Sequence, residues 1–171
     1  TVASNIVSAF GLTNFSDFEI GELPSYTITA SAGANGTISP SGSVSVAGGN
    51  NQSFSITPNS CYRISTLTVN GNPASLTTGS FDNGGTYVFN NVTANQTIDV
   101  TFELKTYTVT VSAGANGSIS PGTGSVNCGD NATYTITPNA GFYISDVQIN
   151  GVSNATAKAN GSYTFSNVTS N

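Results

Sequence analysis

Few residues of this chain are of types that do chemistry. Its 171 residues include no histidine, three cations and eight acids. Without an imidazole, the Ser-His-Asp and Cys-His arrangements of nucleophilic catalysis are excluded, and so are imidazole metal sites. The acids are scattered and form no recognisable catalytic pair. We therefore expect a protein that is not an enzyme and that uses no cofactor or metal.

The densest acidic run is "DFEIGE" at 17–22, which has three acids in six residues. It supplies too few oxygen ligands for calcium and lacks the EF-hand pattern, so a solvated linker is expected. The net charge of −5 gives no basic surface for nucleic acid. No apolar run is long enough to span a membrane. The polar, charge-poor, strand-favouring composition favours an extracellular, cell-surface location.

Two cysteines, Cys61 and Cys128, allow at most one disulfide. They stand at non-equivalent positions of the two repeats described below, where the other repeat has Gly141 and Gly48. A bridge between repeats or between subunits is favoured in an oxidising setting. Two buried thiols are the alternative, and the sequence gives no Cα separation to decide.

Ten Asn-x-Ser/Thr sequences are candidate acceptors of covalent glycans if the host glycosylates them. Their asparagines are Asn14, Asn35, Asn51, Asn91, Asn95, Asn116, Asn131, Asn154, Asn160 and Asn167. Turn-forming Asn beside strand-forming Thr explains most of this number without glycosylation.

The chain contains two copies of one unit. "YTITASAGANGTISP" begins at Tyr26 and "YTVTVSAGANGSISP" begins at Tyr107, a spacing of 81. Later matches follow at spacings of 80 and 76, so a loop is shorter in the second copy. We divide the chain into an N-terminal extension at 1–25, a first repeat at 26–105 and a second repeat at 106–171.

Both copies alternate apolar and polar residues with period two, as in "YTITASA" and "QTIDVTF". Such stretches, rich in Val, Ile, Thr, Tyr and Phe, are typical of half-buried strands. Asn-Gly pairs beside them predict tight type I′ reversals. No stretch shows a sustained helical stripe. We expect an all-β fold of two tandem antiparallel β-sandwiches (Ig-like), preceded by an extended N-terminal segment.

The order "SAGANGxISP", "GSV", "TITPNxGYxI", "VxxNG" and "YTFxNVTxN" resembles the divergent internalin-B-type repeat of bacterial and some archaeal surface proteins. The resemblance covers about 26–102 and 107–171. It implies modules that usually act as stalks or spacers, and it brings no catalytic residues.

The second copy departs from the pattern because it has no counterpart of "QTIDVTF" at 96–102. A sandwich without one strand exposes unpaired backbone groups that another chain can pair with. Strand addition from a neighbouring molecule fills such a position in donor-strand pilins.

The N-terminal extension offers a candidate donor strand made of Ile6, Val7, Ser8, Ala9 and Phe10. Placing Phe10 on Phe102 puts Ile6 on Ile98 and Ser8 on Val100. Val7 and Ala9 then face outward, or they form the buried face in the opposite phase. A second register would use Phe15, Phe18 or Ile20.

Residues 11–25 span at most about 50 Å, so closure within one chain is allowed. Head-to-tail donation between copies is preferred, and it builds an open homopolymer. The leading hypothesis is therefore a structural subunit of an extracellular, pilus-like filament.

The alternative is a stalk or adhesin fragment of a longer surface protein, with a sugar-binding role for its tyrosines. In that case 1–25 would be the tail of a preceding module. The tyrosines that recur in both copies favour packing over a sugar site.

Overall fold

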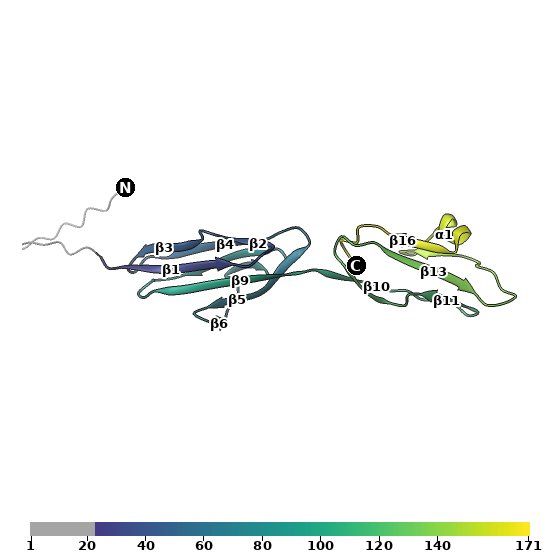
Figure 1. Ribbon diagram of the computed structural model, residues 1–171, viewed down its shortest axis with the longest axis horizontal. Helices are drawn as coiled ribbons and strands as arrows, with labels where there is room; N and C mark the ends of the chain where they lie inside the picture. Colours follow the sequence, from purple (N-terminus) through teal and green to yellow (C-terminus); the bar gives the residue numbers. More distant parts are fainter. Residues whose placement is uncertain (1–22) are drawn as a thin grey trace, which may run out of the picture.

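The computed structural model describes residues 23–171, which form two β-modules lying end to end along the longest axis (Figure 1). The strands of the first module are β1 (Ser25–Ala32), β2 (Gly36–Ser39), β3 (Gly42–Ala47), β4 (Gln52–Pro58), β5 (Tyr62–Val69), β6 (Asn72–Pro73), β7 (Thr78–Ser80), β8 (Gly84–Phe89) and β9 (Gln96–Leu104). The second module contains β10 (Thr106–Val109), β11 (Gly117–Ser120), β12 (Gly124–Asn127), β13 (Ala132–Pro138), β14 (Gln148–Ile149), β15 (Val152–Ser153), α1 (Ala155–Asn160) and β16 (Ser162–Phe165).

The first module is a two-sheet sandwich. A five-stranded sheet has the order β3-β1-β9-β5-β6, and a four-stranded sheet has the order β2-β4-β8-β7. The predicted all-β fold of tandem sandwich-like modules is confirmed. One detail differs, because β1 and β9 pair in parallel while the other pairs are antiparallel. The whole module lies between these two strands in sequence, so no tight hairpin forces them to be antiparallel.

Alternation along β9 shows why these residues form strands. Ile98 and Val100 are fully buried, while Thr97, Asp99 and Thr101 are exposed. Side chains on a strand point alternately to the two sheet faces, so one face of β9 enters the core and the other faces solvent.

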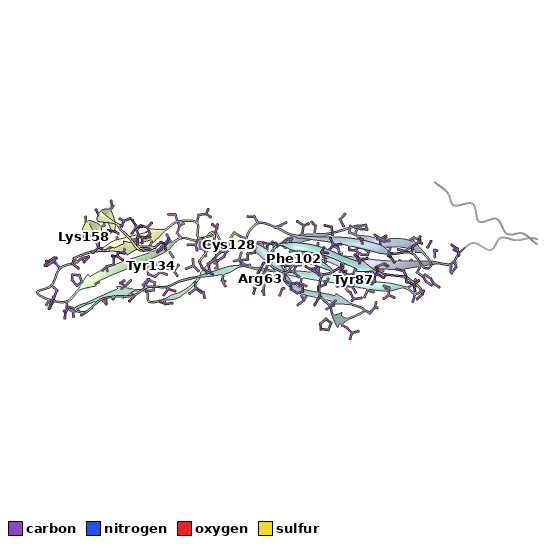
Figure 2. The ribbon with its side chains drawn as sticks, turned by 180° about the vertical axis from the view of Figure 1, so that it is seen from behind. Arg63, Tyr87, Phe102, Cys128, Tyr134 and Lys158 are labelled. Carbon is purple, nitrogen blue, oxygen red and sulfur yellow. A yellow bond between two sulfur atoms is a disulfide. The ribbon has the colours of Figure 1, made fainter. Side chains whose placement is uncertain are left out.

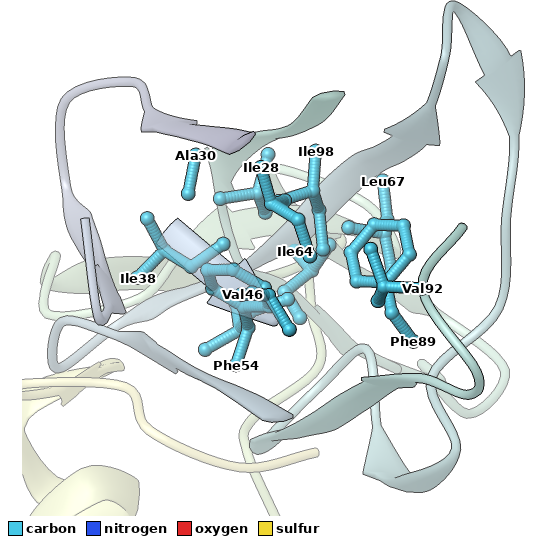
Figure 3. Close-up of a cluster of buried hydrophobic side chains, with 12 residues drawn as sticks. Ile28, Ala30, Ile38, Val46, Phe54, Ile64, Leu67, Phe89, Val92 and Ile98 are labelled. Atoms are coloured by element: carbon cyan, nitrogen blue, oxygen red, sulfur yellow. The ribbon is translucent and has the colours of Figure 1, made fainter. Parts of the chain in front are cut away.

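The core of the first module is a single cluster of twelve buried side chains between the two sheets (Figure 3). Its members are Ile28, Ala30, Ile38, Val46, Phe54, Ile56, Ile64, Leu67, Phe89, Val92, Ile98 and Val100. Burying each of the larger ones contributes about 1.5–3 kcal/mol of hydrophobic free energy. The central position of β9 in the five-stranded sheet makes Ile98 and Val100 part of this cluster.

The second module repeats the first with two differences. Its three-stranded sheet β11-β13-β16 matches β2-β4-β8, but its other sheet exists only as the separate pairs β10-β12 and β14-β15. The second difference is α1, which stands where the first module has β7. Asn154 caps this helix by accepting a hydrogen bond from the Ala157 backbone N–H at 2.8 Å, and Gly161 ends it in the left-handed conformation.

The two modules are joined by one residue, Lys105, between β9 and β10. The Lys105 N–H donates to the Cys61 carbonyl at 2.8 Å, and the Lys105 carbonyl accepts from the Cys128 N–H at 2.9 Å. Cys61 and Cys128 form a disulfide across the junction (Figure 2). Arg63 lies beside it and bonds Glu103 at 2.7 Å. The disulfide and the backbone hydrogen bonds of Lys105 therefore link the two modules, while the Arg63 ion pair lies within the first module.

Candidate functional site: an open strand position in the second module

The second module has a gap in its sheet where the first has a central strand. In the first module β9 lies between β1 and β5, pairing in parallel with β1 and antiparallel with β5. By the repeat spacing, β10 matches β1 and β14 matches β5. Within residues 23–171 no strand lies between β10 and β14. The two strands therefore face each other across an unfilled strand position.

Both strands beside this position are shorter than their counterparts. β1 has eight residues and β10 has four, while β5 has eight and β14 has two. The part of β1 that pairs with β9 begins at Ile28, and β10 ends at Val109, which matches Ile28. Strand geometry is thus lost where the ladder partner is absent, which leaves backbone N–H and C=O groups unpaired with any strand.

Because no strand of the described residues fills this position, the core beside it is half open. Ile28, Ala30, Ile64 and Leu67 are buried in the first module. Their matches in the second module, Val109, Val111, Ile144 and Val147, are only half-buried.

A groove of about 360 Å³ occupies the open position. Its walls are residues 112–116, which follow β10, and residues 143–148, which lead into β14. Its floor is formed by the opposite sheet, with residues 117–119 of β11 and 136–138 of β13. We call this feature the open groove. Its two edges offer backbone hydrogen bonds, and its floor offers apolar surface, which are the two requirements of an added β-strand.

The groove has a glycine at the position where an aromatic ring packs in the first module. In the first module the Phe102 ring of β9 lies against Gly36, where a Cβ would come within 2.3 Å of the ring. Gly117 is the matching residue, and the nearest atom to a Cβ built there is the Thr137 carbonyl oxygen at 3.2 Å. A glycine is needed beside Phe102, and the matching Gly117 has no aromatic atom among the three atoms of the described residues nearest to such a Cβ.

An asparagine lies at the end of the groove nearest the junction between the modules. The Oδ1 of Asn95 accepts a hydrogen bond from the Thr27 N–H at 2.9 Å, and the next residue begins β9. Asn171 makes the same contact, with its Oδ1 accepting from the Thr108 N–H at 2.7 Å. An added strand would start beside Asn171, at the junction, and run toward the far end of the second module.

Asp146 organises the β14 wall of the groove. Its carboxylate accepts hydrogen bonds from Ser153 Oγ at 2.9 Å and from Gln148 Nε2 at 3.1 Å. These bonds, with that from Ser153 the larger cause, lower the pKa of Asp146 below its ordinary value. The carboxylate thereby ties β14 to β15 at the exposed edge.

Of the residues singled out from the sequence, the proposed donor residues Ile6, Val7, Ser8, Ala9 and Phe10 lie outside the described residues. The two cysteines are brought together in the junction disulfide. Asn14 is also outside. The other nine candidate glycan acceptors lie in the described part, where Asn154 is half-buried as the helix cap and the remaining eight are exposed.

One residue of the donor pattern was missed by sequence reasoning. "IVSAFGL" at 6–12 matches "IDVTFEL" at 98–104 in its first, fifth and seventh residues. The seventh is Leu12 on Leu104, and Leu104 lies opposite Tyr62 in the β5–β9 ladder. Extending the comparison two residues beyond Phe10 would have found it.

Other classes of site find little support in the described part of the chain. Residues 23–171 contain no group of three or more His, Cys, Asp or Glu side chains placed to hold a metal ion. None of their helices is long and apolar enough to cross a membrane. Tyr87 and Tyr163 each pack edge-on against a phenylalanine of the same strand, at 4.9 Å between ring centroids. These recurring tyrosines are therefore packing residues.

The fold and the groove define the class of the molecule as a tandem all-β repeat protein. The chain belongs to the family of the divergent InlB B-repeat domain, whose profile matches residues 26–106 and 107–146. The resemblance drawn from the sequence is thereby confirmed. Repeats of this family are associated with extracellular surface proteins, so the chain is a surface-protein repeat module. Comparisons with curated proteins and with solved structures gave no match.

Proposed function

We propose that this protein is the structural subunit of an extracellular filament that polymerises head to tail by strand donation. The N-terminal segment of one copy enters the open groove of the next copy and completes its sandwich. The observation that carries this proposal is the unfilled strand position between β10 and β14.

The first module supplies the register of the donated strand. Ile98 of β9 pairs with Ala30 on one side and Val69 on the other. In the same place Ile6 would lie between Val111 and Ile149.

Further along the groove, Phe10 would lie opposite Ile144 with its ring against Gly117, and Leu12 would lie opposite Phe142. The backbone of the donor runs parallel to β10 and antiparallel to residues 142–149. This register fills the groove from the junction to the far end of the module.

Ser8 is the weak position of this register. It takes the place of Val100, which is 1 % exposed. A hydroxyl in an apolar setting without a partner costs about 1–3 kcal/mol in proteins. Replacing Ser8 by valine should therefore tighten assembly, provided that the Ile6 and Phe10 phase is the buried one.

The geometry favours donation between copies over closure within one chain. β9 has nine residues and runs the length of its module, which is about 30 Å at the rise of a strand. Two modules end to end therefore measure roughly 60 Å.

In the proposed register Leu12 lies at the far end of the second module, while Leu23 is two residues before β1, which starts at the opposite end of the first module (Figure 1). The eleven residue steps between them reach at most about 40 Å. This reach is shorter than the two modules together, which supports donation by a neighbouring copy over the closure within one chain that the sequence alone allowed. Because the donating and accepting surfaces differ, the contact repeats without closing and yields a fibre.

The direct test removes residues 1–12 from the full chain. Purified chains are compared with the intact protein by negative-stain electron microscopy and by sedimentation. The intact protein should form fibres, and the shortened protein should stay monomeric and bind an added peptide of residues 1–12. Fibres of unchanged length from the shortened chain would refute strand donation.

A second candidate function is a stalk module of a longer surface protein. The observation that favours it is the match of "ELPSYT" at 22–27 to "ELKTYT" at 103–108, the module link itself. A preceding module would end in this way. Native material that is monodisperse, with the groove filled by a strand of its own chain, would favour the stalk over the filament.

We further propose that exposed sequon asparagines carry glycans on the outside of the fibre. Their exposed side chains, with Asn35 and Asn116 in matching turns of the two modules, support this role. Mass spectrometry of native peptides before and after deglycosylation tests each site, and unmodified peptides throughout would end this proposal.

A further inference from the structure

The far end of the second module carries a shallow apolar hollow of about 500 Å³. Its lining includes Pro138, Phe142, Tyr143, Ala155, Lys158 and Ala159. Phe142 is 54 % exposed and Tyr143 is 83 % exposed, so two aromatic rings face solvent side by side in sequence. We call this feature the end hollow. Figure 2 places Lys158 on the part of the second module away from the first.

The matching end of the first module is not built in this way. Tyr62, the match of Phe142, is half-buried opposite Leu104. Arg63, the match of Tyr143, forms ion pairs with Glu103 at 2.7 Å and with Asp82 at 3.6 Å. An ion-paired arginine is thus replaced by an exposed tyrosine. The end hollow therefore differs in its residues and charges from the matching end of the first module.

The hollow also has a distinctive charge. Lys158 is the only cation in residues 106–171. No carboxylate of the described residues lies within ion-pair distance of it, since the ion pairs of this part of the chain all involve Arg63. An apolar surface with aromatic rings and one cation fits an extended segment that carries aromatic and acidic side chains.

We propose that residues 13–22 of the donating copy occupy the end hollow. This inference rests on the proposed function, because the donor register brings Leu12 opposite Phe142 and the chain leaves the groove at the hollow. The segment "TNFSDFEIGE" contains Phe15, Phe18 and Ile20 together with Asp17, Glu19 and Glu22, and it has no cation.

The length of the segment supports a docking role. Within one chain a single residue, Lys105, connects β9 to β10. Between copies, residues 13–24 connect the donated strand to β1. These twelve residues are far more than a junction between modules needs. The surplus is apolar and acidic, and the surface at which it emerges is apolar with one lysine.

Docking of this segment clamps the donated strand at the end where it leaves the groove. It covers Phe142 and Tyr143 and pairs Lys158 with an acidic side chain of the incoming copy. The open groove sets the register of the donated strand. The end hollow adds an ionic contribution to the binding of the donating copy, and this contribution weakens as the salt concentration rises.

The test uses the full chain and synthetic peptides as inhibitors of its polymerisation, followed by light scattering. The peptides cover residues 1–12, residues 1–22, and residues 1–22 with Asp17→Asn, Glu19→Gln and Glu22→Gln. Peptide 1–22 should inhibit at about tenfold lower concentration than peptide 1–12, since it buries additional aromatic surface. Peptide 1–22 with the three acids replaced by amides should lose part of this advantage. High salt should reduce the difference in inhibitory concentration between peptides 1–22 and 1–12.

The variants Tyr143→Ser and Lys158→Glu in the polymerising chain should reduce the advantage of peptide 1–22 over peptide 1–12. Val152→Ser is the matched control, because Val152 is 69 % exposed and does not line the hollow.

Equal inhibition by peptides 1–12 and 1–22 would overturn the inference and leave strand donation intact. If neither peptide inhibits and the chain without residues 1–12 still polymerises, both the inference and the proposed function fail.

Discussion

Replacing Phe10 by alanine should weaken assembly more than any other single change in the proposed donor strand. The matching residue of the first module is Phe102, whose ring fills the space above Gly36 and is half-buried. Phe10 would fill the same space above Gly117. The change removes the ring without altering the backbone hydrogen bonds of the donated strand.

The expected size follows from the burial of Phe102. Truncating a fully buried phenylalanine to alanine costs about 3–5 kcal/mol, and a half-buried ring about half of that, or roughly 2 kcal/mol. This free energy corresponds to about a 30-fold rise in the concentration at which fibres form. Val7→Ala is the matched control, because Val7 takes the outward place of Asp99, which is exposed.

The assay is sedimentation of fibres over a range of protein concentrations, which gives the concentration of unpolymerised subunit. Phe10→Ala should raise this concentration about 30-fold, and Val7→Ala should leave it within a factor of two or so. A larger effect of Val7→Ala would show that the opposite phase of the strand is buried. Equal and small effects of both changes would refute donation by this segment.

Three further results are expected. Gly117→Leu should block fibre formation by filling the place of the donated ring. Gly122→Leu should not, because Gly122 does not line the open groove and a Cβ there meets nothing within 4 Å. Fibre yield by electron microscopy checks both, and equal yields would contradict the ring position. Changing Cys61 and Cys128 to serine opens a bridge that spans 67 residues, which by loop entropy is worth about 4 kcal/mol, so thermal unfolding should shift to lower temperature, and an unshifted curve would show that the bridge is not stabilising. Because the pKa of Asp146 is lowered in the folded state, the ionised carboxylate stabilises β14 and β15 fully at pH values above its unfolded pKa, and this stabilisation is lost as pH falls through the lower folded value. The amide signals of β14 and β15 in NMR spectra should therefore change below about pH 4. In Asp146→Asn the same signals should be insensitive to pH in that range.

The sequence predicts the strands well because their signal is local. Alternation such as that around Ile98 and Val100 requires only that one sheet face be buried. Paired positive φ angles at Asn70 and Gly71, of 51° and 75°, give the type I′ turn that the Asn-Gly pair predicts. The repeat then predicts a second module of the same kind.

The features that sequence reasoning missed depend on partners far away in the chain. The parallel pairing of β1 with β9 joins strands at opposite ends of a module, and no local pattern encodes it. The helix α1 is six residues long and buries only Ala157, so it has no apolar stripe to detect. The pairing of Cys61 with Cys128 needed a Cα separation, which is 5.4 Å.

The sequence likewise predicts one part of the candidate site, the open strand position, and not the other, the end hollow. The unfilled strand position within residues 107–171 was predictable, because the first copy contains "QTIDVTF" and these residues contain no counterpart. The end hollow was not, since "GFYISDVQI" at 141–149 reads as an alternating strand, like its counterpart β5. Without a neighbouring strand, most of this stretch forms no ladder, and the rings of Phe142 and Tyr143 remain exposed.

The most direct measurement is an electron cryo-microscopy map of the purified native protein at side-chain resolution. We predict fibres in which a strand lies between β10 and β14 and carries the side chains of residues 6–12 of an adjacent copy, with the Phe10 ring above Gly117. A groove filled by residues of the same chain, or single particles with an empty groove, would contradict donation between copies.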